Sequence, residues 1–169
     1  MKIGSLLLRL TVGGLFIGHG AQKLFGWFGG QGLAGTAKAF EKLGLYPGRR
    51  HALVAGAAEM GGGALLAAGL ATPLAATVVT ATMLTAIERI HAKNGPWVQN
   101  GGYEYNLVLV AAALALAEDG SGDASLDGVL GTEHAGPGWA LAALAGGVAG
   151  AAATHVAAAR GGTGVTTAA

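Results

Sequence analysis

The sequence predicts an all-α integral membrane protein, a four-helix bundle with one additional C-terminal transmembrane helix. Hydrophobic residues make up 52% of the 169 residues and charged residues only 11%, whereas about a quarter of the residues of a soluble domain are charged. The apolar residues gather in five runs, most of them close to the roughly 20 residues that a helix needs to cross a bilayer. The length favours a single domain.

The first three runs are long enough to cross the membrane. They cover residues 3–25, 51–70 and 73–90. Only Ala71 and Thr72 separate the second run from the third, and the third begins at a proline, which is favoured at the first position of a helix. We therefore expect the second and third spans to form an antiparallel hairpin.

The last two runs differ in length. Residues 105–117 would form only about 20 Å of helix, so this span must include flanking residues or lie where the bilayer is thin. Residues 139–159 form a fifth span of ordinary length. The predicted organisation is a four-helix membrane domain over residues 1–131, an extra transmembrane helix within 132–160, and a flexible tail over 161–169.

The connections between the spans predict the orientation. Segment 26–50 carries Trp27, Phe28 and Tyr46 and the amphipathic sequence FEKLG, which is typical of a segment lying in the membrane interface. Residues 118–138 are acidic and glycine-rich, as expected of an aqueous loop. Eight Lys and Arg residues fall on the side of the C-terminus and two on the other, which predicts an N-terminus outside and a C-terminus in the cytoplasm.

The first span carries Arg9, His19 and Lys23 on one stripe about 80° wide, if each residue turns the helix by about 100°. Gly14 and Gly18 lie on the opposite side of the same helix. We therefore expect a polar face that points into the bundle and a small-residue face that packs against another helix.

The second span holds one charged residue, Glu59, with Gly56, Gly62 and Gly63 around it at helical spacing. These glycines allow either close helix packing or the close approach of a flat ligand to the carboxylate, and packing is the commoner role.

The third span ends in a Glu-x-x-His pair, Glu88 and His91. This spacing occurs in carboxylate-bridged metal sites of helix bundles. Such a site needs a second pair and two more carboxylates, and Glu59, Glu104 and His19 do not complete that set. We therefore predict no metal centre.

Buried charges in the spans should find partners, because a charge at mid-membrane costs about 2.5 to 3.5 kcal/mol on insertion scales. The pairs favoured by sign and depth are Arg9 with Glu59, and Lys23 or Arg89 with Glu88 or Glu104. Together the polar groups form a candidate quinone pocket, which consists of Arg9, His19, Lys23, Glu59, Glu88, His91 and Glu104. The alternative is that these pairs only fix the register of the helices.

The composition excludes several other functions. The sequence has no cysteine, which removes disulfides, thiolate metal sites and CxxC redox chemistry. The net charge is +1 without a basic run, so we do not expect nucleic-acid binding. Neither a nucleotide fingerprint nor a haem-type histidine pair is present. We expect no intrinsic cofactor and no stand-alone catalysis, although a quinone can still bind.

Several stretches of the sequence together resemble the DoxX family (DoxX/DoxD-like) of small bacterial membrane proteins. They are RLTVGGLFIGHGAQKLFGWFGG at 9–30, AFEKLG at 39–44, AAEMGGGALLAAGLATPLAA at 57–76, HAKNGPW at 91–97, GGYEYNLVL at 101–109 and SLDGVLG at 125–131. The matching motif positions are Arg9, His19, Gly20, Lys23, Glu59, Gly62, His91, Glu104 and Asp127.

The resemblance implies a four-helix protein of the bacterial cytoplasmic membrane, associated in some members with thiosulfate:quinone oxidoreductase or other membrane oxidoreductases. The fifth span departs from this pattern. Its Gly146-xxx-Gly150 motif is typical of helix packing and suggests docking of a partner subunit or self-association.

Three functions stay open at this point. The first is an accessory subunit of an oxidoreductase or respiratory assembly that contacts quinone, with the bilayer and other membrane subunits as partners. The second is a non-enzymatic scaffold or partner-docking subunit whose buried ion pairs are structural. The third is a small-molecule transporter, although no inverted repeat is visible in the sequence.

Overall fold

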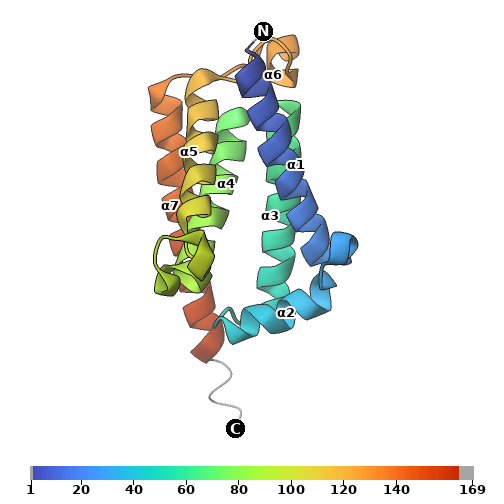
Figure 1. The fold of residues 1–169 in the computed structure, drawn as a ribbon, viewed down its shortest axis with the longest axis vertical. Coiled ribbons are helices and arrows are strands. Elements are labelled where there is room, and N and C mark those ends of the chain that lie inside the picture. The colour runs from blue at the N-terminus through green and yellow to red at the C-terminus, as the bar shows by residue number, and fades with distance from the viewer. Residues whose placement is uncertain (1, 164–169) are drawn as a thin grey trace.

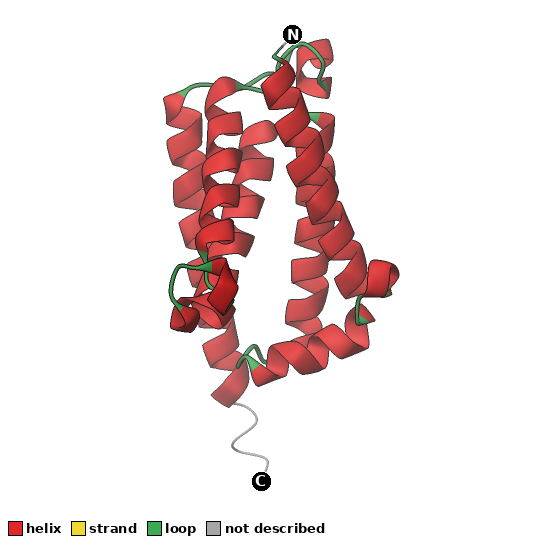
Figure 2. Ribbon diagram, in the orientation of Figure 1, coloured by secondary structure: helices red, strands yellow, loops and turns green. Residues whose placement is uncertain are grey.

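The structure is a computed structural model that describes residues 2–163. All the regular secondary structure in this part of the chain is helical (Figure 2), which confirms the predicted all-α class. The long helices of the bundle are α1 (Ile3–Phe25), α3 (Gly48–Ala68), α4 (Thr72–Ala86), α5 (Glu104–Asp119) and α7 (Pro137–Thr163). The helix α7 extends past the predicted start of the tail at residue 161, and residues 164–169 lie outside the described part.

The bundle consists of two layers. One layer is α1 packed antiparallel against α3, and the other is α4 packed against α5 and α7 (Figure 1). A tight turn joins the layers between α3 and α4, where Gly69 and Ala71 both have positive φ. This turn produces the predicted hairpin of the second and third spans.

Four helices within the described residues are long and apolar enough to cross a membrane. They are Ile3–Phe25, Gly48–Ala68, Thr72–Asn94 and Pro137–Gly162. The third of these continues from α4 through a π-helical turn, Ile87–His91. The helix α5 is shorter, with 16 residues, as the short fourth run predicted. The predicted C-terminal transmembrane helix is confirmed.

The segment between α1 and α3 contains a short helix, α2 (Gly32–Lys42), that runs across the end of the bundle (Figure 1). The preceding turn exposes Trp27 and Phe28, at 59% and 75% of their surface. Exposed aromatic side chains beside a helix that crosses the bundle end fit a location at the membrane interface. The interfacial location of residues 26–50 stays a prediction.

The contact between α1 and α3 uses Gly56 and Gly63 of α3, as predicted, but on α1 it uses glycines other than the predicted Gly14 and Gly18. A Cβ added to Gly14 or Gly18 would meet nothing within 4 Å, so the prediction that these two form the packing face is wrong. Instead, a Cβ on Gly13 would lie 2.6 Å from the carbonyl oxygen of Gly63, and one on Gly20 would lie 2.6 Å from that of Gly56. The prediction chose the wrong face of α1 because the hydrophobic pattern does not say which side of this helix faces α3.

The glycines of α7 pack within the same chain. A Cβ on Gly146 would lie 2.8 Å from Thr77, and one on Gly150 would lie 3.0 Å from Ala81. Gly147, between them, lies against Thr80. The small-residue motif of the fifth span therefore seats α7 on α4, so this motif is not the free docking surface that we considered.

Candidate functional site

A cavity of about 660 Å³ lies between the two layers of the bundle. Its walls come from α1 and α3 on one side and from α4, α5 and α7 on the other. Most of the lining is apolar, and Leu15, Phe16, Val78 and Leu109 form part of the wall that lies away from α2. The cavity is large enough to hold a small ligand.

Most of the charged and histidine side chains of the cavity gather toward the end that α2 crosses. They include Lys23 near the end of α1, His51 near the start of α3, and Arg89 and His91 beyond α4. Glu59 lines the wall from α3. An apolar cavity with a few polar groups at one end is suited to an amphipathic molecule.

The central ion pair joins Lys23 to Glu59, with Nζ and Oε2 2.6 Å apart. The Lys23 side chain is 24% exposed and the Glu59 side chain 7%. Burying a carboxylate costs less free energy when a cationic group lies within hydrogen-bond distance of it. The expected pairing of Glu59 with Arg9 is therefore wrong, and so is the pairing of Lys23 with Glu88 or Glu104.

The π-helical turn brings Arg89 to the cavity. A π turn is rare and occurs often at functional sites, and here it places Arg89, Ile90 and His91 together on the lining. The Arg89 Nη2 lies 3.6 Å from Glu88 Oε1, as predicted for this pair. Its Nε is buried and has no hydrogen-bond partner within the described residues. An unpaired buried donor of this kind can bind an acceptor oxygen of a ligand.

Three histidines line the cavity, each with one ring nitrogen in contact with a neighbour. The His19 Nδ1 lies 3.1 Å from Gln22 Oε1, the His51 Nε2 lies 3.2 Å from the Tyr46 carbonyl oxygen, and the His91 Nδ1 lies 2.7 Å from the Gly101 carbonyl oxygen. These contacts orient the imidazole rings. Their second nitrogens provide further polar atoms near the cavity.

Arg9 belongs to a different part of the molecule. It is 1% exposed and lies near the N-terminal end of the bundle, away from the cavity. Its Nη1 and Nη2 donate to the carbonyl oxygens of Ser121 and Ala124, each at 2.6 Å. The guanidinium lies directly against Gly69, where a Cβ would collide with it. Arg9 therefore fastens the 120–127 loop onto the bundle and does not contribute to the cavity.

Asp127 completes this fastening. Its backbone N–H donates to the carbonyl oxygen of Gly69 at 2.9 Å, and its Oδ2 accepts from the backbone N–H of Thr72 at 3.4 Å. The second contact satisfies one of the free N–H groups at the start of α4. The motif SLDGVLG thus has a structural explanation at the turn between α3 and α4.

Two further predicted site residues lie outside the cavity lining. The Glu88 Oε1 is 2.6 Å from His155 Nδ1, on an exposed surface between α4 and α7. The Glu104 Oε1 accepts from the backbone N–H of Val98 at 2.7 Å and so closes the turn before α5. Of the seven predicted residues, the cavity therefore brings together His19, Lys23, Glu59 and His91.

The sequence analysis missed His51, Tyr105 and Asn106 as lining residues. His51 and Tyr105 stood at the predicted ends of spans, where a polar atom is unremarkable. Asn106 is 6% exposed within an otherwise apolar run, and a lone amide inside a span is the signal that would have indicated it.

Sequence comparison shows which family of known proteins the chain is similar to. The family model described as DoxX matches residues 4–92, which include α1, α3 and α4. A protein of Bacillus subtilis (strain 168) named "Putative oxidoreductase CatD" is 36% identical over 115 residues, which make up 68% of this chain and 79% of that protein. No solved structure matches significantly. The chain is therefore a multi-pass membrane protein and belongs to the DoxX family.

Proposed function

We propose that this protein is an accessory membrane subunit of an oxidoreductase and that its cavity binds a lipid-soluble quinone. The observation that carries the proposal is the cavity of about 660 Å³ between the helix layers, apolar over most of its wall and polar near α2. A quinone has the matching chemistry, because its flat ring carries two acceptor oxygens and its chain is apolar.

The donors at the polar end suit the quinone oxygens. Lys23 donates to Glu59, but an ammonium has three hydrogens, so two are left for other acceptors. The unpaired Nε of Arg89 is a second donor. A bound carbonyl oxygen would satisfy that buried group, which otherwise costs about 1 to 3 kcal/mol.

An accessory role follows from the residues available. Without cysteine, this chain cannot pass electrons through thiols or thiolate-bound clusters. Electrons would have to come from a partner subunit or a soluble enzyme, with this protein holding the quinone in the membrane. The relative's name, which describes an oxidoreductase, supports a redox setting.

The proposal includes an orientation in the bacterial cytoplasmic membrane. The end of the bundle that holds α2 and the last turns of α7 (Figure 1) carries most of the Lys and Arg residues outside the helix centres. These are Lys38, Lys42, Arg49, Arg50, Lys93 and Arg160. An excess of basic residues marks the cytoplasmic side, so the polar end of the cavity would lie toward the cytoplasm.

Photolabelling with an azido-quinone tests the site in membranes that contain the full-length protein. Ala58 lines the cavity, whereas its neighbour Ala57 is exposed on the outside of α3. We expect Ala58→Phe to fill the cavity and reduce labelling at least fivefold, and the matched control Ala57→Phe to leave it unchanged. Mass spectrometry should place the label on peptides that contain cavity residues.

Two outcomes would contradict the quinone proposal. One is labelling that is equal in the two phenylalanine variants, which would show that the probe binds the outer surface. The other is purification from native membranes without quinone or a co-purifying subunit, together with unchanged respiration in a deletion strain. That second result would favour the scaffold.

A further inference from the structure

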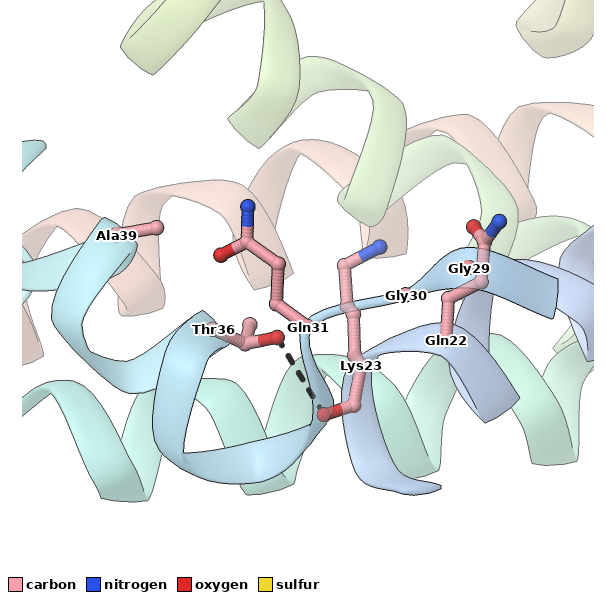
Figure 3. Close-up of a pocket in the computed structure, with 7 residues that line it drawn as sticks. All are labelled: Gln22, Lys23, Gly29, Gly30, Gln31, Thr36 and Ala39. Carbon is pink, nitrogen blue, oxygen red and sulfur yellow. Dashed lines mark hydrogen bonds between the residues drawn. The ribbon is translucent and has the colours of Figure 1, made fainter. Parts of the chain in front are cut away.

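A second, smaller pocket lies where α1 meets α2. It has a volume of about 310 Å³ and is lined by Gln22, Lys23, Gly29, Gly30, Gln31, Thr36 and Ala39 (Figure 3). The side chains of Gln22, Lys23 and Gln31 extend to the same side in the close-up. The pocket lies at the end of the bundle that α2 crosses, and most of its side chains are polar.

The two glycines keep the pocket shallow and open. Gly29 has a positive φ of 77°, and a Cβ on Gly30 would collide with Gln22. The turn therefore folds tightly against α1, and the backbone instead of a side chain forms this wall. On the opposite wall, the Thr36 hydroxyl donates to the carbonyl oxygen of Lys23 at 3.4 Å.

Lys23 lines both this polar pocket and the central cavity. Its amine contacts Glu59, which lines only the cavity. A second polar link runs beside it, because Gln22 of the polar pocket contacts His19 of the cavity. Hydrogen-bonding side chains therefore stand at the boundary between the polar pocket and the cavity.

We propose that the polar pocket is the aqueous port of the cavity, through which water and protons reach its polar end, with the Lys23 side chain as the partition. The volume is enough for several water molecules, each of which occupies about 30 Å³ in the liquid, and the amide and hydroxyl groups supply their partners. The port does not depend on the ligand. If the cavity holds a quinone, as proposed above, the same route serves proton exchange at its head group.

The absence of cysteine from the sequence makes a clean accessibility test possible. Ala58→Cys and Ala55→Cys each place one thiol on the cavity wall and leave the Lys23–Glu59 pair intact. Leu66→Cys, a core position with 0% exposure, is the buried control. The probe is a trimethylammonium methanethiosulfonate, whose fixed charge prevents entry through lipid. We expect both cavity thiols to react at least tenfold faster than the core thiol, and only when the probe is on the α2 side of sealed vesicles.

Two further variants test the route itself. Ala39 lines the pocket and Ala34 is exposed on the same helix. We expect Ala39→Phe to slow modification of the cavity thiol at least tenfold, and Ala34→Phe to leave the rate unchanged. Removing the partition with Lys23→Ala should raise the rate at least threefold.

The port is refuted if neither cavity thiol reacts faster than the core thiol, or if reaction is equally fast from the opposite side. Equal rates in the Ala39→Phe and Ala34→Phe backgrounds would also refute it. Because the thiol reaction needs no quinone, failure of the quinone labelling alone overturns the proposed function and leaves the port standing. Failure of the thiol test alone overturns the port and leaves the proposed function standing.

Discussion

Replacing Gly20 with alanine should loosen the contact between α1 and α3, whereas the same change at Gly14 should not. A Cβ on Gly20 would lie 2.6 Å from the carbonyl oxygen of Gly56 and 2.6 Å from the backbone nitrogen of Met60. Both are backbone atoms, so they cannot turn aside, and the helices themselves must separate. A Cβ on Gly14 meets nothing within 4 Å.

The size of the effect follows from comparing the two variants. Each replaces glycine inside the same helix, so each gains a similar helix propensity, about 0.5 to 1 kcal/mol. That gain cancels in the comparison, and the overpacking cost at Gly20, about 1 to 3 kcal/mol, remains. We expect Gly20→Ala to be less stable than Gly14→Ala by that amount, which lowers the midpoint of thermal unfolding by roughly 2 to 12 °C.

Thermal unfolding of the two purified variants in the same detergent and lipid mixture measures this difference. The wild-type protein should fall between the two variants or close to Gly14→Ala. Equal midpoints for the two variants would refute the reasoning, and so would a larger loss at Gly14. A larger loss at Gly14 would mean that α1 presents the predicted glycine face to α3, and equal midpoints would mean that the contact at Gly20 is not as tight as its 2.6 Å distances imply.

Two other predictions concern the polar groups. Arg9→Met leaves the carbonyl oxygens of Ser121 and Ala124 without their donor, so we expect a loss of about 3 kcal/mol of stability. Proteolysis within residues 120–127 should also become faster, and an unchanged cleavage rate would contradict the fastening role. For the ion pair, the losses of stability in Lys23→Met and Glu59→Gln should add up to more than the loss in the double variant. The difference is the coupling energy of the pair, which we expect to be about 1 to 3 kcal/mol. A double-mutant cycle from thermal unfolding measures that coupling, and simple additivity would count against the pair.

The sequence was informative wherever chain composition alone sets the outcome. Length and hydrophobicity predicted the helices and the hairpin at Pro73, because a helix across lipid must satisfy its own backbone hydrogen bonds. The sequence was less informative about which charged side chains contact each other. Arg9 and Glu59 have opposite signs, yet they lie in different parts of the molecule. The 120–127 loop accepts from Arg9 through backbone oxygens, which have no signature in the sequence.

The lining of the cavity also contains some residues that the sequence predicted and others that only the structure reveals. The polar residues of the spans could be named in advance, and four of the seven line the cavity. The contribution of Arg89 depends on the π turn that redirects the chain after α4, and helical periodicity cannot anticipate a turn with a different period. His51 lines the cavity from the start of α3, and the sequence does not say which side of α3 faces the other layer.

By itself, the sequence determined that this chain forms apolar helices in a membrane with a few costly polar groups among them. Only the tertiary structure decided which glycines touch, which charges pair, and that the two helix layers leave a cavity between them. The physical reason is that hydrophobicity and helix propensity depend on the local sequence of each segment. Pairing and packing depend instead on how each helix is rotated and on which helices become neighbours.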